Sequence, residues 1–323
     1  MGRHIIGIDV GGTTVKIGII NENGNILDKW EIPTDTSNGG ISILKDIWLS
    51  INKKLTVNRI DRGKIAGIGL GAPGFVDAEN GKIYQAVNIG WKDINISEEL
   101  GTLSNLPVYV QNDANIAVLG ENWKGAGEQA QNLLAVTLGT GVGGGIIANG
   151  TVLNGENGTA GEIGHITVEP GGIPCNCGRK GCLETVASAT GIVRQAMKGI
   201  ESNPDSMLAA YYKNKGYLSA KDVFALANEG DALCEDIIKR TTDLLGYVIA
   251  NLAVTINPSK VLIGGGVSKA GERLIQAIDK AFRKYALKRV SDVCQIKTAQ
   301  LGNDAGIIGA AFLVKQNEEN VTF

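Results

Sequence analysis

Residues 4–31 read HIIGIDVGGTTVKIGIINENGNILDKWE, three apolar segments separated by a glycine pair and by an Asn-Gly turn. Short apolar segments bounded by such residues are typical of β-hairpins. The pattern predicts strands at His4–Val10, Val15–Asn21 and Ile26–Glu31. The N-terminal region is therefore predicted to be a β-meander whose first two strands are joined by a glycine-rich elbow.

A similar pattern returns at residues 133–153, LLAVTLGTGVGGGIIANGTVL. A shift of 127 positions places Gly12-Thr13 on Gly139-Thr140 and Val15 on Val142. Glycine-rich hairpins can resemble each other by chance, but the length of the match favours a duplicated domain. Two glycine elbows facing each other across a cleft would offer backbone N–H groups to a polyphosphate from both sides. The sequence therefore predicts a nucleotide site in a cleft between two related α/β domains.

Further strands and helices are predicted from apolar runs and their periodicity. The last predicted helix, rich in Ala, Gly and Ile, is expected to pack on the first domain. The expected division is residues 1–118 with helix 304–323 against residues 119–303. Polar residues follow several strands, which is where open α/β sheets bind ligands. The remaining predicted elements are strands at Lys64–Leu70, Val108–Gln111, Leu133–Leu138, Val142–Ile147 and Val261–Ile263, and helices at Ala114–Trp123, Asp231–Ile256 and Asp304–Lys315.

The charge and composition indicate partners that are small molecules. The 323 residues carry 31 basic and 33 acidic side chains, a net charge of −2, with no block of like charge. This balance argues against nucleic-acid or membrane-surface binding. The N-terminal apolar run ends early, at Asp9, and no stretch reaches the length of a membrane span. We expect a two-domain protein of the cytoplasm, without nucleic-acid or membrane partners.

The first elbow carries groups suited to a nucleotide. In Asp9-Val-Gly-Gly-Thr13, followed by Thr14, the glycines allow the backbone to approach phosphate, and Asp9 could hold Mg²⁺ through water. A purely structural turn is the alternative for a single such loop, and the second elbow, Gly139-Thr140-Gly141, favours nucleotide binding. Neither the P-loop nor the dinucleotide fingerprint is present. Lys16 could reach a phosphate or be a solvated strand lysine.

Asn112-Asp113 ends the predicted strand Val108–Gln111. An aspartate is costly to bury unless it has partners or a chemical role. One interpretation is an N-cap for the helix that follows. The other is a general base, because phosphoryl transfer needs a carboxylate that accepts the proton of the attacking hydroxyl. We favour the general base for Asp113.

Three cysteines and a histidine predict a structural metal site. Cys175, Cys177 and Cys182 lie close together in the sequence and His165 precedes them. One nitrogen and three sulfur ligands complete a tetrahedral zinc site with no open position. Such a site would fix the loop that carries Glu162 and Glu184, whose carboxylates could bind sugar hydroxyls. His165 would bind the metal through one ring nitrogen and keep the other for a substrate hydroxyl.

These motifs together resemble the ROK family of bacterial sugar kinases and repressors, over about residues 5–313. Within it the chain is most similar to the ATP-dependent glucokinases. The resemblance implies an actin-like ATPase, ribonuclease-H-like fold of two duplicated domains, usually as a homodimer with its dimer surface in the larger domain. The motifs are Asp9-Val-Gly-Gly-Thr13, Gly71-Ala-Pro-Gly74, Asn112-Asp113, Leu138-Gly-Thr-Gly-Val-Gly-Gly-Gly145, Gly161-Glu-Ile-Gly-His165 and the cysteines.

The resemblance also assigns roles. It implies that Asp113 deprotonates the sugar 6-hydroxyl and that ATP, Mg²⁺ and a structural Zn²⁺ take part. Gln111 departs from the acid that relatives often have before Asn-Asp. The implied sugar ligands are Asn88, Asn112, Asp113, Glu162, His165 and Glu184; the implied nucleotide-binding residues are Asp9, Gly11, Gly12, Thr13, Thr14, Lys16, Gly139, Thr140, Gly141, Gly265 and Gly266; the zinc ligands are His165, Cys175, Cys177 and Cys182.

Rival functions exist within this resemblance. ROK repressors carry a DNA-binding module before the first glycine loop. Here that loop begins at Asp9, which argues against a repressor. A filament-forming or chaperone-like ATPase of the same fold would lack the cysteine loop with its carboxylates. Sibling kinases for mannose, N-acetylmannosamine, N-acetylglucosamine or fructose could use the same groups, and polyphosphate could replace ATP. Glucose is the favoured substrate on similarity over the whole chain.

Overall fold

The computed structural model describes residues 3–319 and 322–323. Its contacts divide the chain into two compact units. The chain changes unit near residues 131, 144, 161 and 299, whereas the predicted boundaries follow residues 118 and 303. The assignment of functional domains stays a prediction. Unit 1 contains the chain up to Gln131, Gly145–Gly161 and the segment from Gln300; unit 2 contains Asn132–Gly144 and Glu162–Ala299.

The first sheet confirms the predicted N-terminal meander. Its strand order is β3-β2-β1-β4-β8. β1 is antiparallel to β2, which is antiparallel to β3, and β4 is parallel to both β1 and β8. Gly7 on β1 stands opposite Gly18 on β2 and Gly69 on β4. The strands are β1 (His4–Val10), β2 (Thr14–Asn21), β3 (Ile26–Pro33), β4 (Ile65–Ala72) and β8 (Val108–Asn112).

The second sheet repeats this order as β11-β10-β9-β12-β13. β10 is antiparallel to β11, and β12 is parallel to β9 and β13. Each strand has a counterpart in the first sheet, in the same order along the chain, which supports the predicted duplication. The strands are β9 (Leu133–Leu138), β10 (Val142–Ala148), β11 (Thr151–Val152), β12 (Lys260–Gly264) and β13 (Gln295–Thr298).

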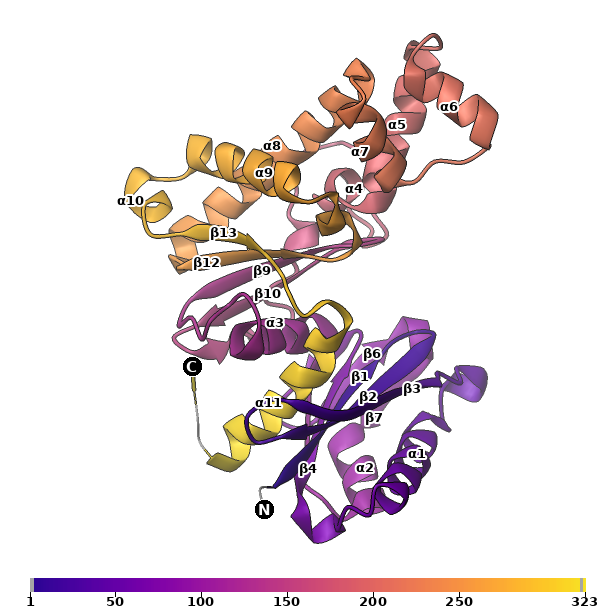
Figure 1. The fold of residues 1–323 in the computed structure, drawn as a ribbon, viewed down its shortest axis with the longest axis vertical. Helices are drawn as coiled ribbons and strands as arrows, with labels where there is room; N and C mark the ends of the chain where they lie inside the picture. The colour runs from indigo at the N-terminus through magenta and orange to yellow at the C-terminus, as the bar shows by residue number, and fades with distance from the viewer. Residues whose placement is uncertain (1–2, 320–321) are drawn as a thin grey trace. The chain divides into compact units, whose positions relative to one another are not determined.

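Helices cover both faces of the first sheet (Figure 1). α1 (Ile43–Val57) and α2 (Ile96–Ser104) share an apolar core with alternate residues of β1 and β2. On the opposite face, α11 (Ala305–Glu319) packs on β1 and β4 and lies against α3 (Asp113–Lys124). The last helix therefore lies in unit 1. Of the predicted helical segment to 323, residues 320 and 321 lie outside the described residues and 322–323 are not helical.

Alternation along β4 lets α11 approach the sheet closely. Ile68 and Leu70 belong to the core with α1, whereas Gly67 and Gly69 face α11. A Cβ on Gly69 would lie 1.7 Å from the carbonyl oxygen of Ala310. Successive residues of a strand point to opposite faces, so residues two apart share a face. Gly67 and Gly69 are two apart and therefore leave the same face without side chains.

A reciprocal glycine contact joins α3 and α11. A Cβ on Gly120 of α3 would lie 2.0 Å from the carbonyl oxygen of Ala305. A Cβ on Gly309 of α11 would lie 1.7 Å from the carbonyl oxygen of Ile116. In α3 the carbonyl residue Ile116 precedes Gly120 by four positions, and in α11 Ala305 precedes Gly309 by four. Each helix therefore offers a glycine to a carbonyl of the other helix.

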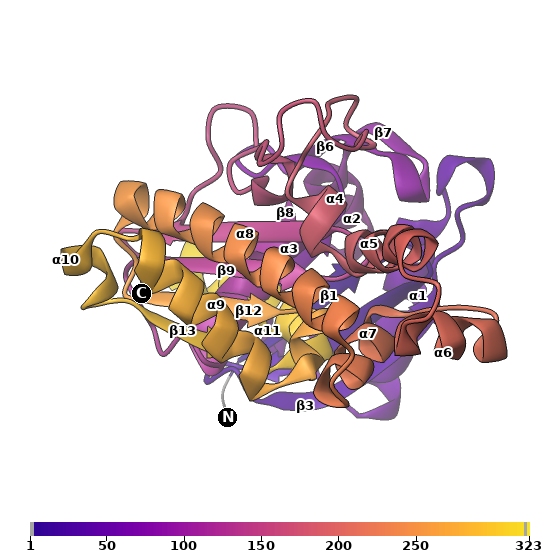
Figure 2. The same ribbon diagram turned by 90° about the horizontal axis from the view of Figure 1, so that it is seen from above.

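Unit 2 is mostly helical outside its sheet strands (Figure 2). The long helix predicted at residues 231–256 is α8, and Asp231 caps it by accepting a hydrogen bond from the Cys234 N–H at 2.7 Å. α8 packs along α9. The helices are α4 (Glu184–Ala187), α5 (Ala189–Ser202), α6 (Met207–Lys215), α7 (Ala220–Asn228), α8 (Ala232–Ile256), α9 (Glu272–Tyr285) and α10 (Lys288–Ser291).

A small antiparallel sheet in unit 1 was not anticipated from the sequence. Among the described residues no helix is both long and apolar enough to cross a membrane. The sheet contains β5 (Phe75–Asp77), β6 (Lys82–Ala86) and β7 (Trp91–Asn95); the short 3₁₀ helices are η1 (Ser37–Gly39), η2 (Arg62–Lys64), η3 (Val87–Ile89), η4 (Ile163–His165), η5 (Gly266–Ala270) and η6 (Gly302–Asp304).

The approach of α11 to β4 predicts that Gly69→Ala destabilises the protein. The new methyl group would overlap the Ala310 carbonyl, and we expect the free energy of unfolding to fall by about 3 kcal/mol because the helix must move. Gly63→Ala is the matched control, since its Cβ would make only an ordinary 3.5 Å contact. Urea unfolding of both variants measures the effect, and equal midpoints would contradict the close packing.

Candidate functional site

The first glycine elbow is closed by backbone hydrogen bonds. The Gly11 N–H donates to the Thr14 carbonyl at 3.0 Å. Thr34, after β3, donates its N–H to the Thr13 carbonyl at 2.9 Å and its hydroxyl to the Gly11 carbonyl at 2.7 Å. Asn88 in η3 lies beside the elbow, its Cβ 3.8 Å from the place of a Cβ on Gly12. The structure therefore brings Asn88 to the predicted phosphate loop.

Asp9 lies on the face of β1 that is covered by α11. A Cβ on Gly306, near the start of α11, would lie 2.6 Å from Asp9 Oδ2, so the carboxylate occupies space that a side chain there would fill. Lys16 Nζ lies 3.9 Å from the same oxygen. Burial raises the pKa of Asp9, and the charge of Lys16 partly opposes this. Lys16 thus faces a carboxylate, and its role toward phosphate stays a prediction.

The turn from β8 into α3 places Asp113 at the first position of the helix. Asn112 is the N-cap, because its side-chain oxygen accepts from the Ala114 N–H at 2.9 Å. The N-cap at the pair Asn112-Asp113 is therefore Asn112, and the role of Asp113 as a general base stays a prediction. Asn112 also donates to the Gly74 carbonyl at 3.1 Å, which ties the Gly71–Gly74 loop to this turn. The Asp113 carboxylate accepts from the Ala114 N–H at 2.8 Å.

Gln111 organises this turn, a role the sequence did not reveal. Its buried amide donates to Asn154 Oδ1 at 2.9 Å. Its oxygen accepts from the Asn112 N–H at 2.8 Å and from Asn115 Nδ2 at 3.2 Å. An ionised acid at this position could not donate to Asn154. The departure from the family pattern is thus matched by a partner 43 residues away in the sequence.

The second elbow is held by the start of α5. The Gly139 N–H donates to the Gly141 carbonyl at 3.0 Å, and the Ala189 N–H donates to the Gly139 carbonyl at 2.8 Å. The Thr190 hydroxyl donates to the Thr140 carbonyl at 2.9 Å. Gly265, with φ of 83°, packs against the residue before this elbow, since a Cβ there would lie 2.5 Å from the Leu138 carbonyl oxygen. Unit 2 therefore brings Gly265-Gly266 beside the second glycine loop.

Glu184 lies between the second elbow and the cysteine loop. Its Oε2 accepts from the Val142 N–H at 3.4 Å and would be 2.5 Å from a Cβ on Gly141. The Cys175 thiol donates to its Oε1 at 3.2 Å. A cavity of about 230 Å³ beside it is lined by these groups and by Thr140. The predicted sugar ligand thus also contacts the phosphate loop.

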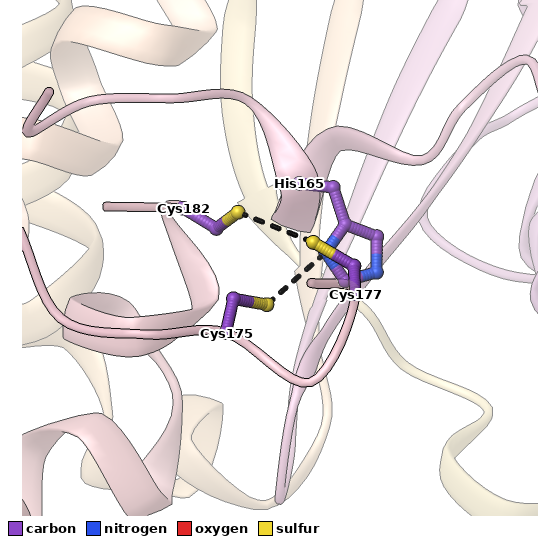
Figure 3. A group of neighbouring side chains, drawn as sticks. All are labelled: His165, Cys175, Cys177 and Cys182. Atoms are coloured by element: carbon purple, nitrogen blue, oxygen red, sulfur yellow. Dashed lines mark hydrogen bonds between the residues drawn. The ribbon is translucent and has the colours of Figure 1, made fainter. Parts of the chain in front are cut away.

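The predicted metal ligands form one cluster (Figure 3). Cys175 Sγ lies 3.5 Å from His165 Nδ1, and Cys177 Sγ lies 3.6 Å from Cys182 Sγ. One ligand atom from each of the four residues lies within 4.8 Å of the others. Sulfur atoms bound to one tetrahedral zinc are about 3.7 Å apart. The donor set and its spacing therefore fit a closed four-ligand metal site.

Arg179 supports this cluster and was missed in the sequence. It donates to the His165 carbonyl at 2.7 Å. Hydrogen bonds to Cys177 from the Arg179 backbone N–H, the larger cause, and from the Arg179 guanidinium lower the pKa of Cys177 to about 6. Burial raises the pKa of Cys175 to about 12. The position of Arg179 between Cys177 and Cys182 in the sequence could have indicated this role, because a nearby cation favours the thiolate form of cysteine.

His165 has its two ring nitrogens in different surroundings. Nδ1 faces the thiol of Cys175, and Nε2 lies 3.8 Å from Oε2 of Glu162. Glu162 is the N-cap residue of η4. The ring nitrogen that does not face the cysteines therefore lies beside a second predicted sugar ligand.

Comparison with known proteins identifies the family. The ROK family model matches residues 5–317. This chain belongs to the ROK family. Among ROK relatives, the glucokinase of Halalkalibacterium halodurans is 53% identical over 320 residues, which cover 99% of this chain and 97% of the relative.

Solved ROK structures share the fold. The ROK hexokinase of Thermus thermophilus has a TM-score of 0.83 and 30% identity, covering 98% of this chain and 100% of that one. The ROK glucokinase of Streptomyces griseus, solved with glucose and AMPPNP, has a TM-score of 0.76 and 33% identity, covering 97% of this chain and 99% of that one. These ROK structures confirm the predicted fold class.

Burial of Asp9 predicts a pH-dependent loss of stability. Because its pKa is raised in the folded state, the folded chain binds this proton more tightly than the unfolded chain does. The free energy of unfolding should therefore fall as the pH rises from the usual value of 3.8 through the raised pKa. Asp9→Asn should lack this loss and be more stable at neutral pH. Thermal melts across pH measure this, with Asp236→Asn on the surface of α8 as control; parallel curves for Asp9→Asn and the unchanged protein would contradict it.

Proposed function

We propose that this chain is an ATP-dependent glucokinase that transfers the γ-phosphoryl group of ATP to the 6-hydroxyl of glucose. The observation that carries the proposal is similarity to bacterial glucokinases over nearly the whole chain. In this chain a carboxylate, Asp113, stands at the start of α3. A ROK relative has been solved with glucose and AMPPNP together, which supports the same pair of substrates here.

Asp113 is the proposed general base. It accepts the proton of the 6-hydroxyl while the sugar oxygen forms a bond to the γ-phosphorus and the bond from that phosphorus to the β-phosphate oxygen breaks, releasing ADP. Asn112 caps α3 and fixes the backbone on which Asp113 stands. The proposed ligands of the other sugar hydroxyls are Asn88, Asn112, Glu162, His165 and Glu184.

The proposed nucleotide site uses the two glycine elbows. The N–H groups of Gly11 and Gly139 close the elbows, so the backbone N–H groups of Gly12, Thr13, Thr140 and Gly141 are the proposed donors to phosphate. Thr14 and Lys16 lie beside the first elbow. Gly265-Gly266 would lie against the adenosine. Asp9 would hold Mg²⁺, since a carboxylate oxygen is a ligand this cation prefers, and the bound ion neutralises charge on the transferred group.

Zinc is the proposed metal of the cysteine cluster. Three thiolates and one imidazole are the ligands of structural zinc sites, and four protein ligands leave no position for water. The chemistry that zinc supplies here is cross-linking of the loop from His165 to Cys182. His165, Cys175, Cys177 and Cys182 would hold the ion. The homodimer and the cytoplasmic location stay predictions.

Release of ADP across a panel of hexoses tests the proposal. We expect strong turnover with glucose, none without a sugar, and weaker turnover with mannose, fructose, N-acetylmannosamine and N-acetylglucosamine, because unmatched hydroxyl contacts are costly. Preference for an N-acetylated sugar would establish a sibling kinase instead. Hydrolysis of ATP at the same rate without sugar would indicate an ATPase.

Substitution of the base gives a separate prediction. Asp113→Asn removes the proton acceptor but keeps the size of the side chain, so kcat should fall by about 10²- to 10⁴-fold. Glucose binding, measured by calorimetry, should persist. Asp205→Asn, on the exposed loop before α6, is the matched control and should keep normal kcat. A near-normal rate for Asp113→Asn would remove the assigned role.

Metal analysis tests the zinc site. Protein purified without chelator should contain about one zinc per chain, because the site has four ligands for one ion. Cys177→Ser removes a thiolate and should lower both the zinc content and the melting temperature. Cys294→Ala, which changes a buried thiol outside the cluster, should keep the zinc. Full zinc in Cys177→Ser would refute this ligand set.

A further inference from the structure

A large groove runs between α8 and α9. None of its lining residues belongs to the two glycine elbows. The two helices lie side by side in both views (Figures 1 and 2) and run in the same direction, since early residues of one pair with early residues of the other. The cavity between them measures about 650 Å³. This size suits a small organic ligand. Its lining includes Phe224, Ile238, Thr242, Leu274, Ala277 and Ala281.

Polar contacts close both ends of the groove. At one end, Arg273 of α9 donates to Asn228 Oδ1 at 2.6 Å and lies 3.4 Å from Glu235 of α8. At the other end, Lys284 and the Tyr285 hydroxyl donate to Asp243 at 2.9 and 2.7 Å. The eleven residue steps from Arg273 to Lys284 span about 16 Å of helix. The groove is therefore an elongated slot with fixed ends.

Small side chains on α9 form the floor of the slot. Ala277 and Ala281 lie one turn apart on the same side of the helix, where larger apolar residues would otherwise fill the space between two helices. Ala281 also packs against α8, because a Cβ on Gly246 would lie 2.4 Å from the Cβ of Ala281. The small side chain of Ala277 leaves an apolar depression between the two helices.

The charge around the slot is positive. Four cations line it, Lys239, Arg273, Lys280 and Lys284, against two carboxylates, Glu235 and Asp243, which already have cationic partners. Lys239 and Lys280 make no hydrogen bond or ion pair among the described residues. An apolar floor with cations at its rim favours a ligand that combines an apolar body with an anionic group.

We propose that this slot binds a small anionic ligand whose body is an elongated aromatic or ring system. The ring system would lie on the partly exposed apolar lining, Phe224, Ile238 and Ala277. The anionic group would meet Lys239 or Lys280. The slot shares no residue with the two glycine elbows, although Ala270 at one end of it belongs to η5, which begins at Gly266 of the proposed adenosine loop. The proposal is that the ligand in the slot does not overlap the nucleotide, which competition with AMPPNP tests. The proposal does not depend on which sugar the protein phosphorylates.

The probe is 8-anilinonaphthalene-1-sulfonate, an aromatic sulfonate that fluoresces in apolar sites. We expect saturable binding of one probe per chain to the full-length protein. Ala277→Glu places a carboxylate on the floor and should weaken binding by at least about ten-fold, through charge and lost space. Gln276→Glu introduces the same residue next to it on the exposed face of α9, outside the slot, and should bind the probe as the unchanged protein does.

Two further measurements decide the location and the charge. Lys280→Gln should weaken sulfonate binding and leave binding of uncharged N-phenyl-1-naphthylamine unchanged. Saturating AMPPNP with glucose should leave the sulfonate bound. Displacement by AMPPNP would make the slot part of the nucleotide site and overturn the proposal, as would absence of saturable binding or equal affinity in Ala277→Glu. Circular dichroism confirms that each variant is folded.

Discussion

The close approach of α11 to the first sheet is the constraint on which unit 1 depends. Gly7 of β1 and the alternate glycines Gly67 and Gly69 of β4 leave one face without side chains at these positions, and α11 fills that space. The opposite face keeps its isoleucines and leucines for the core with α1. The same period-two alternation thus sets a tight helix contact on one side and a deep apolar core on the other.

This constraint also determines where Asp9 lies. Asp9 follows Gly7 on the α11 face of β1, and the absence of a side chain at Gly306 gives its carboxylate room. The raised pKa shows that burying this group opposes its ionisation. The ionised carboxylate that the proposed cation site needs is the form of Asp9 that burial disfavours. Such a trade-off between stability and activity is common at functional sites.

Local patterns made much of the fold predictable. The elbows, the meander and the long helix ending at Ile256 follow from turn residues and periodicity, and the cysteine cluster follows from ligands close together in the sequence. Contacts between distant segments were not predictable in this way. The pairing of Gln111 with Asn154 and the position of Glu184 against Gly141 depend on tertiary packing. The sheet of β5 to β7 and the helices α4 to α7 were not predicted, although Ser219 and Asp222 form a capping box at the start of α7.

The reciprocal contact of α3 with α11 bears on how such a chain could have arisen. Each helix follows the last strand of its own sheet, and each presents a glycine to a carbonyl of the other. This is the geometry of a two-fold axis. An ancestral protein of half this length, with one sheet and one such helix, could have formed a symmetric pair through that helix. Fusion of two gene copies would then have made the pairing permanent within one polypeptide.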